Sequence, residues 1–284
     1  MKRKLLLVIA LLALPLSGCS IISVGYNYAD AILKYSINSY ASFNNAQKQT
    51  INTDVKAFMG WHRKKMLPEY ISFLQELQRT EESGAVLKKE DVARFRTGLR
   101  TLYVRTLLPA IKPAAKLLSG MSPGQVQEMA QSFARENSKQ RDKELGGSID
   151  DRLRKRAERS IDFLENQVGV FSDRQLEKIR EMSRQLPFAT AIYISQREDY
   201  QARLVALLKN NSNEEEITAF LSSWLLAPEA NRSADEQSMI FAFENASDEM
   251  IANVYQMLTE RQKNTLHKNI LKYIDTFQEL VNKQ

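Results

Sequence analysis

Apolar residues recur every three or four positions along almost the whole chain. One such face holds Ile51, Val55, Phe58, Met59, His62 and Met66, and another holds Leu266, Ile270, Ile274, Phe277 and Val281. A helix of 3.6 residues per turn brings positions with this spacing to one side. Short alternating runs between Asn-Gly or Asp-Gly turns, which indicate strands, are nearly missing. The pattern predicts an all-α protein, a multi-helix bundle or irregular helical array of eight or nine helices.

Four stretches share one frame, in which an apolar residue is followed by Asn, Ser or Thr and, three residues later, by Gln. They are FNNAQKQTI at 43–51, MSPGQVQEM at 121–129, FSDRQLEKI at 171–179 and LTERQKNTL at 258–266. The frame predicts a capping box, in which the cap side chain accepts the N–H of the third helical residue and Gln reaches back to the cap's N–H. The predicted pairs are Asn44 with Gln47, Ser122 with Gln125, Ser172 with Gln175, and Thr259 with Gln262. For capping alone, Glu would serve as well as Gln.

Leu-Pro occurs three times, at Leu67-Pro68, Leu108-Pro109 and Leu186-Pro187. Proline inside an apolar helical pattern kinks the helix or ends it at the preceding residue. We therefore expect proline-kinked helices. Gly120 allows a division into an amino-terminal lobe, residues 26–119, and a carboxy-terminal lobe, residues 120–284.

The first residues predict export from the cytoplasm. Three basic residues precede an apolar run from Leu5 to Leu16, which is shorter than the ~20 residues that a membrane-spanning helix needs. Residues 1–18 are therefore predicted to be a signal peptide. The chain carries 40 Lys and Arg against 34 Asp and Glu, and three of the basic residues lie in this segment. The small net positive charge that remains after its removal does not predict a nucleic-acid binder.

Leu16-Ser17-Gly18-Cys19 resembles the lipobox of bacterial lipoproteins. The resemblance implies that Cys19, the only cysteine, carries diacylglycerol and an amine-linked acyl chain such as palmitate, and that 19–25 form the lipidated anchor and a short tether. Ser20, which is not Asp, implies an outer-membrane address. The expected location is the outer membrane, facing the periplasm. The alternative is a free thiol behind a conventional signal peptide.

WHRKKMLPEY at 61–70 and YNYADAILKY at 26–35, behind the lipobox, resemble a family of uncharacterised proteobacterial outer-membrane lipoproteins, a domain of unknown function. No activity follows from that resemblance. The Leu258–Gln262 stretch is similar to the LTxxQ motif of the periplasmic chaperones of the Spy and CpxP family, which are shorter, not lipidated and have two such motifs. That likeness implies a chaperone-like role and assigns no binding residue.

Candidate chemistry is sparse. His62 and His267 are the only histidines and lack the spacing of a metal site, so neither metal nor cofactor is predicted. His62, beside Trp61, is expected to be a hydrogen-bonded, partly buried residue, with a ligand or general base as the alternative. No Gly-x-Ser-x-Gly or phosphate-binding loop occurs. Glu82-Ser83 matches the catalytic dipeptide of lytic transglycosylases but lacks their downstream Gly-Leu-Met-Gln.

Two surfaces have two interpretations each. The basic run DDRLRKRAERS at 150–160 fits anionic lipid or glycan, or a solvated helix face with Asp150 paired to Arg154 and Asp151 to Lys155. Four tyrosines near the anchor fit a membrane surface or, preferably, core packing; they are Tyr26, Tyr28, Tyr35 and Tyr40.

These patterns favour a non-enzymatic envelope protein, chaperone-like or scaffold, that is held to the membrane by lipid at Cys19 and presents grooves to an envelope protein partner. No catalytic residue is assigned, and the oligomeric state is left open. The alternative is a peptidoglycan-cleaving enzyme that uses Glu82. A deep groove around Glu82 would favour the enzyme, and a shallow apolar groove would favour polypeptide binding.

Overall fold

The computed structural model describes residues 19–282. Within that range every regular element is a helix, which confirms the predicted all-α class. The elements are α2 (Cys19–Asn27), α3 (Ala29–Asn38), α4 (Asn45–Trp61), η1 (His62–Met66), α5 (Leu67–Glu82), α6 (Lys89–Leu107), η2 (Leu108–Ala110), α7 (Ile111–Ser119), α8 (Pro123–Leu145), α9 (Ile149–Val168), α10 (Asp173–Gln185), α11 (Thr190–Lys209), α12 (Glu214–Leu226), η3 (Pro228–Asn231), α13 (Ala234–Gln256) and α14 (Glu260–Asn282). They outnumber the eight or nine helices expected, because turns divide several of the apolar-periodic segments.

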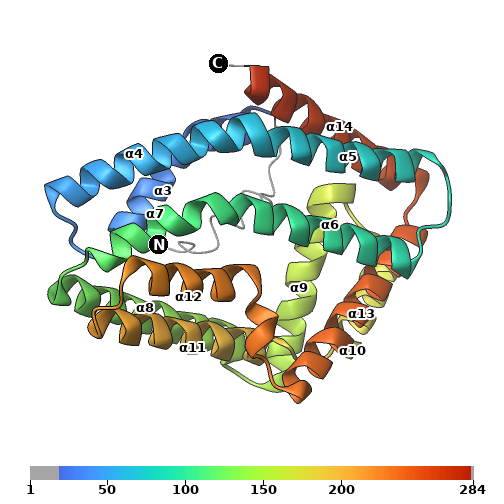
Figure 1. Ribbon diagram of the computed structural model, residues 1–284. Helices are drawn as coiled ribbons and strands as arrows, with labels where there is room; N and C mark the ends of the chain where they lie inside the picture. The colour runs from blue at the N-terminus through green and yellow to red at the C-terminus, as the bar shows by residue number, and fades with distance from the viewer. Residues whose placement is uncertain (1–18, 283–284) are drawn as a thin grey trace.

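The helices α4, η1 and α5 form one continuous rod, which runs along the top of Figure 1. The rod contains Pro68, which has no N–H and whose ring clashes with a carbonyl four residues back in a regular α-helix. The π-helix η1 absorbs this residue, since the N–H of Leu67 bonds to the carbonyl of His62, five residues earlier. The wider π turn replaces the kink or break predicted at Leu67-Pro68.

The other two prolines of the Leu-Pro pairs act differently. At Pro109 the 3-10 turn η2 leads from α6 into α7, so the two helices form a second rod beneath the first (Figure 1). At Pro187 helix α10 has already ended, with Leu186 as its extended C-cap. The same dipeptide therefore gives a π turn, a 3-10 turn and a helix end.

Later helices pack back onto the early ones. Helix α14 lies along α5 and also contacts α2, while α12 packs on α7 and α13 on α6. In Figure 1, α8, α11 and α12 gather below α7, and α9, α10 and α13 gather below the far end of α6. The division near Gly120 stays a prediction, and helices from both sides of it pack against each other.

Four apolar clusters form the core. One joins α2, α5 and α14 around Leu67 and Leu280, and a second joins α7, α8, α11 and α12 around Ala115 and Ile217. A third lies among α9, α10, α13 and α14, and the fourth holds the α3–α4 loop, through Phe43, against α4. Residues 19–25, expected as a tether, are part of helix α2, because α2 packs against α14.

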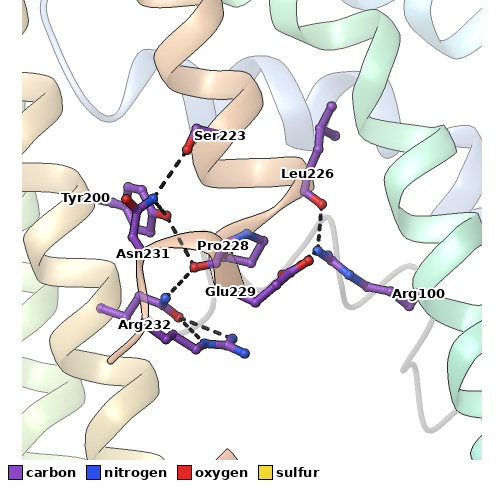
Figure 2. A network of polar contacts seen from close by, with 9 residues as sticks. Arg100, Tyr200, Ser223, Leu226, Pro228, Glu229, Asn231 and Arg232 are labelled. Atoms are coloured by element: carbon purple, nitrogen blue, oxygen red, sulfur yellow. Dashed lines mark hydrogen bonds and ion pairs between the residues drawn. The ribbon is translucent and has the colours of Figure 1, made fainter. Parts of the chain in front are cut away.

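The turn between α12 and α13 is fixed by side chains from two other helices (Figure 2). Asn231 of η3 donates to the hydroxyl of Tyr200 on α11 at 2.6 Å. Tyr200 in turn donates to the carbonyl of Pro228 at 3.3 Å. From α6, Arg100 donates to the carbonyl of Leu226 at 2.7 Å and pairs with Glu229 at 3.3 Å. These bonds satisfy backbone acceptors at the helix end that the chain itself leaves open.

Candidate functional site

All four Gln frames lie at helix starts, as the sequence predicts. In each, the Gln N–H donates to the cap side chain and the cap N–H donates to the Gln Oε1 atom. The pairs are Asn44 with Gln47, Ser122 with Gln125, Ser172 with Gln175 and Thr259 with Gln262. Each helix therefore begins with a closed capping box.

The first two frames meet across the fold. The Nε2 atom of Gln125 donates to Oε1 of Gln47 at 2.7 Å, and Nε2 of Gln47 donates to Oε1 of Gln125 at 3.2 Å. Each amide also donates to a carbonyl five residues before the partner Gln, Gly120 at 3.0 Å and Ser42 at 2.9 Å. The α3–α4 loop is thereby fastened to the start of α8.

The other two frames repeat this arrangement. Gln175 and Gln262 donate to each other's Oε1 atoms at 2.9 and 3.3 Å. Their amides also donate to the carbonyls of Met257 at 2.8 Å and Val170 at 2.9 Å, again five residues before the partner. The two junctions therefore have the same local two-fold arrangement.

The pairing explains why these frames carry Gln. Two further capping boxes, at Asn213 and Ser233, use Glu216 and Glu236 in the third helical position. Glu216 is exposed and Glu236 is partly exposed. A carboxylate can accept the cap N–H, but it has no proton to donate to a second helix. The sequence predicted the caps but not the pairs, and the presence of Gln rather than Glu was the available signal.

A large apolar cavity lies beside the first junction. Its volume is about 590 Å³, within the ~300–1,000 Å³ typical of small-molecule sites. The walls come from α3, the α3–α4 loop, α4, η1, the end of α6, η2 and α7, with one residue each from α5 and α8. Prominent lining residues are Ile37, Phe58, Trp61, Leu107, Pro113 and Leu117.

One wall of the cavity contains a buried polar chain centred on His62. Tyr26 lies 2.9 Å from Nδ1 of His62, Tyr70 lies 3.3 Å from Nε2, and the Tyr70 hydroxyl lies 2.6 Å from Thr106. Thr106 donates to the carbonyl of Leu102 at 2.8 Å. Its single proton is thus used, so Tyr70 donates to Thr106, His62 donates from Nε2 to Tyr70, and Tyr26 donates to Nδ1.

Burial keeps this chain neutral. It lowers the pKa of His62 to about 4, because desolvation disfavours the imidazolium. Burial also raises the pKa of Tyr26 to about 12, so its hydroxyl keeps the proton that it donates. His62 is 5% exposed, so the interpretation as a hydrogen-bonded buried histidine fits better than that of a ligand or base.

The cavity offers few free polar groups to an occupant. His62, Tyr70 and Thr106 use their polar atoms on one another. The other polar lining residues include Tyr40, Asp54 and Tyr103, which are only partly buried. A buried peptide group without a partner costs ~1–3 kcal/mol. The interior therefore suits hydrocarbon.

Glu82 lies elsewhere. Its side chain, 48% exposed, ends α5, accepts from Gln78 at 2.8 Å and lies 3.9 Å from His267. His267 has its closer contact with Glu81, at 2.8 Å. Glu82 lines neither the apolar cavity nor the small hollow beside Arg79 and Asp91. Neither of these two spaces is therefore the deep groove around Glu82 that would favour a glycosidase.

The basic run 150–160 is largely engaged by the protein. Arg156 donates to the carbonyls of Ser183 and Pro187 at the end of α10. Arg154 lies 2.8 Å from Glu158 and 3.4 Å from Asp151, in place of the predicted pairing with Asp150. The helix places Asp151 one turn before Arg154, within reach of its guanidinium.

Among residues 19–282, no three His, Cys, Asp or Glu side chains gather as a metal site would require.

The four amino-terminal tyrosines divide into two kinds. Tyr26 is buried against His62, and Tyr40 lies partly buried against Phe133 and lines the cavity. Tyr28 and Tyr35 are 63% and 58% exposed. The preferred interpretation, core packing, therefore holds for Tyr26 and Tyr40 but not for Tyr28 and Tyr35.

The predicted anchor lies at the edge of the described chain. Cys19 is the first residue of α2, and the predicted signal peptide, 1–18, lies outside the described residues. None of the helices within 19–282 has both the length and the apolar character needed to cross a membrane.

Comparison with known proteins gives one match. Residues 39–235, more than half of the chain, match the family described as "Family of unknown function (DUF6279)". Neither a curated protein nor a solved structure matches. The match confirms the expected kinship with an uncharacterised family; it includes the 61–70 stretch and excludes 26–35. Lipidation, outer-membrane location and likeness to the LTxxQ chaperones remain predictions.

Proposed function

The chain belongs to the family of unknown function DUF6279, from which no activity follows, and we propose that it binds a hydrocarbon chain in its apolar cavity. We further propose that it is non-enzymatic and is held by lipid at Cys19 to the periplasmic face of the outer membrane. A hydrocarbon ligand takes the place of the envelope protein partner expected from the sequence as the occupant of the cavity.

The observation that carries the proposal is the composition of the cavity wall. A space of about 590 Å³ is lined by aromatic, aliphatic and proline side chains. The polar chain through His62 is closed by internal bonds. Displacing water from such a surface with hydrocarbon is favourable at ~25 cal/mol per Å² of apolar area.

A polypeptide is the less suitable occupant. Each peptide group in the cavity would bring an N–H and a C=O that need partners. The wall residues His62, Tyr70 and Thr106 already bond to one another, so a peptide backbone would find few. Chaperone-like or scaffold contacts with an envelope protein would have to use another surface.

The chain offers an internal reporter for the test. It has two tryptophans: Trp61 lines the cavity, and Trp224 stacks on Tyr200 in the second apolar cluster. Bromine quenches tryptophan fluorescence on contact. The full chain, carried in polymer-bounded membrane discs to avoid detergent, would be titrated with a brominated fatty acid.

The expected result is quenching in the Trp224→Phe variant, which retains Trp61, and none in the Trp61→Phe variant. Ala114 lines the cavity, so Ala114→Phe, in the Trp224→Phe background, should abolish the quenching. Ala202→Phe, at an exposed position of α11, is the matched control. Quenching that survives Ala114→Phe would overturn the proposal.

The same preparation addresses the alternatives. If the chain suppresses aggregation of unfolded envelope proteins and Ala114→Phe leaves this unchanged, a chaperone surface outside the cavity is favoured. If it releases peptidoglycan fragments and Glu82→Gln stops the release, the enzymatic alternative replaces the proposal.

A further inference from the structure

We propose that one face of α2 and α3 lies flat on the membrane, with the head-group region of a phospholipid bilayer as its partner. The inference rests on the proposed lipid anchor at Cys19 and does not depend on what the cavity binds. It assigns an interaction surface that we call the outer stripe, which consists of Val24, Tyr28, Ala31 and Tyr35, all of them exposed.

The two helices form one rod. The N–H of Tyr28 donates to the carbonyl of Val24 at 3.1 Å, and the N–H of Ile32 donates to the carbonyl of Tyr28 at 3.0 Å. These bonds, each to a carbonyl four residues earlier, continue the helical pattern across the junction between α2 and α3. The other stripe residues follow Val24 after four, seven and eleven positions. Residues with this spacing lie on one side of a helix, so the outer stripe runs along the rod.

The opposite side of the rod packs on the body of the protein. Tyr26, Ala29 and Ser36 are at most 8% exposed, and Tyr26 bonds to His62 at 2.9 Å. The three large side chains of the outer stripe are 50 to 63% exposed. The rod is therefore held in place from its inner side, while valine and tyrosine side chains remain accessible on its outer side.

The outer stripe carries no charge at neutral pH. Apart from the stripe, the one exposed residue between positions 23 and 38 is Asn27. The only charged residues of the rod, Asp30 and Lys34, pair with each other at 3.0 Å. On α10, by contrast, most exposed positions hold Asp, Glu, Lys or Arg, as is typical of a helix face in water. An exposed but uncharged face of this kind indicates a contact with another surface.

A bilayer surface fits the outer stripe better than a protein partner does. Tyrosine has an apolar ring and a polar hydroxyl, and it is enriched where a membrane meets water. Lipid at Cys19, the first residue of the rod, would hold the bilayer beside the stripe, so the second contact would be intramolecular. A protein partner that binds from solution lacks this advantage.

The contact also fixes the direction of the rod. A helix rises about 1.5 Å per residue, which places Tyr35 about 24 Å from Cys19 along the rod. An upright rod would hold Tyr35 far above the head groups. All four stripe residues can reach the bilayer surface only if the rod lies parallel to it.

The test places a spin label between the two tyrosines and leaves both intact. Cys19 is the only cysteine and its thiol would be alkylated, so an introduced cysteine would be the one free thiol. The full lipidated chain with Ala31→Cys would be labelled with a nitroxide and reconstituted into vesicles of phosphatidylethanolamine and phosphatidylglycerol. Electron paramagnetic resonance then compares collisions of the label with oxygen, which concentrates in the bilayer, and with a water-soluble nickel chelate. Ala202→Cys, at an exposed position of α11, is the matched control.

The expected result is more oxygen collision and less nickel collision for the label at position 31 than for the label at position 202. Adding Val24→Asp, Tyr28→Asp and Tyr35→Asp should raise nickel collision at position 31 to the level of the control, because charged side chains favour water over the bilayer interface. Melting temperatures show that each variant is folded, and flotation with the vesicles shows that the anchor still holds it.

Four results would overturn the inference. Equal collisions at positions 31 and 202 in vesicle-bound protein would mean that the outer stripe faces water while the anchor stands. Shielding from both oxygen and nickel would indicate a protein contact, such as a second copy of the chain. Shielding from nickel that survives the three Asp substitutions would show that the stripe does not make the contact. Failure to float with the vesicles would remove the anchor and the stripe together, whereas the cavity function would still be decided by Ala114→Phe.

Discussion

Gln175 and Gln262 donate hydrogen bonds to each other's carboxamide oxygens, at 2.9 and 3.3 Å, from the first turns of α10 and α14. Both side chains are at most 9% exposed. The same oxygens accept the N–H groups of Ser172 and Thr259. One carboxamide thus starts its own helix and binds that helix to a second one.

This arrangement predicts that Gln175→Glu destabilises the protein by about 2 to 4 kcal/mol. The carboxylate can still accept the N–H of Ser172. The oxygen that replaces Nε2 faces two other acceptors, Oε1 of Gln262 and the carbonyl of Met257, and it buries a negative charge. Urea unfolding at neutral pH measures the change.

The matched control is Glu216→Gln. Glu216 holds the same third position of a capping box, with Asn213, but at an exposed site. Its replacement should change stability by less than ~0.5 kcal/mol. Equal stability of Gln175→Glu and the unmodified protein would mean that the carboxamide serves only as a cap, as the frame by itself suggests.

The difference between caps and pairs shows what the sequence can predict. A capping box joins residues three apart, so Ser172 and Gln175 could be assigned from local chemistry alone. The bond from Gln175 to Gln262 joins residues 87 apart in the chain. It depends on where α10 and α14 meet, and helical periodicity gives the buried face of each helix but not its neighbour.

His62 predicts a loss of stability in acid. Burial lowers its pKa to about 4 in the folded state, against ~6.5 for an unfolded histidine. Between these values the unfolded chain binds the proton more readily, so stability falls as the pH falls from 6.5 towards 4. The contribution lost between pH 7.5 and 4.5 is about 2 to 3 kcal/mol.

Carboxylates also titrate in this range, so the measurement compares variants. His62→Gln keeps a donor for Tyr70 and an acceptor for Tyr26 without a titrating group. The stability difference between the unmodified protein and His62→Gln, from urea unfolding, should shift by that amount between the two pH values. A difference that stays constant with pH would contradict the buried neutral imidazole. His267→Gln shows how much the other histidine contributes.

The buried ion pair between Arg96 and Asp248 leads to a second prediction of a large change in stability. Arg96 donates from Nε and Nη2 to the Asp248 carboxylate at 3.0 to 3.2 Å, and the Asp248 side chain is 2% exposed. Arg96→Ala should cost about 3 to 5 kcal/mol in unfolding free energy, because it leaves a buried charge unpaired. Adding Asp248→Asn should recover part of the loss.

Arg94 is the surface control for this prediction. It lies on the same helix, 3.2 Å from Asp91 and 3.5 Å from Glu76, with its side chain 53% exposed. Arg94→Ala should cost less than ~1 kcal/mol, as exposed ion pairs do. Similar losses of unfolding free energy for Arg94→Ala and Arg96→Ala would contradict the prediction that burial of Asp248 makes its ion pair more important for stability.

The cavity illustrates what the sequence could not predict. Phe58 and His62 share a helical face with Ile51 and Val55, which predicts burial. Whether that face is filled or left hollow depends on how closely α7 approaches α4. The π turn at His62, set by Pro68 and tertiary packing, has no reliable sequence signal beyond the proline itself.

Lipidation at Cys19 is the prediction on which the proposed location depends. Mass spectrometry of the mature amino terminus should find cysteine with a diacylglycerol and an acyl chain. Each buried methylene adds ~0.8 kcal/mol to membrane binding, so three acyl chains hold the protein on the membrane.

Cys19→Ala should leave unprocessed precursor, because the thiol to be alkylated is gone. Ser20→Asp should instead move the mature protein to the inner-membrane fraction. An unmodified mature terminus at another residue would contradict lipidation. Because α2 begins at Cys19 and packs on α14, an anchored terminus would hold the helical body close to the membrane.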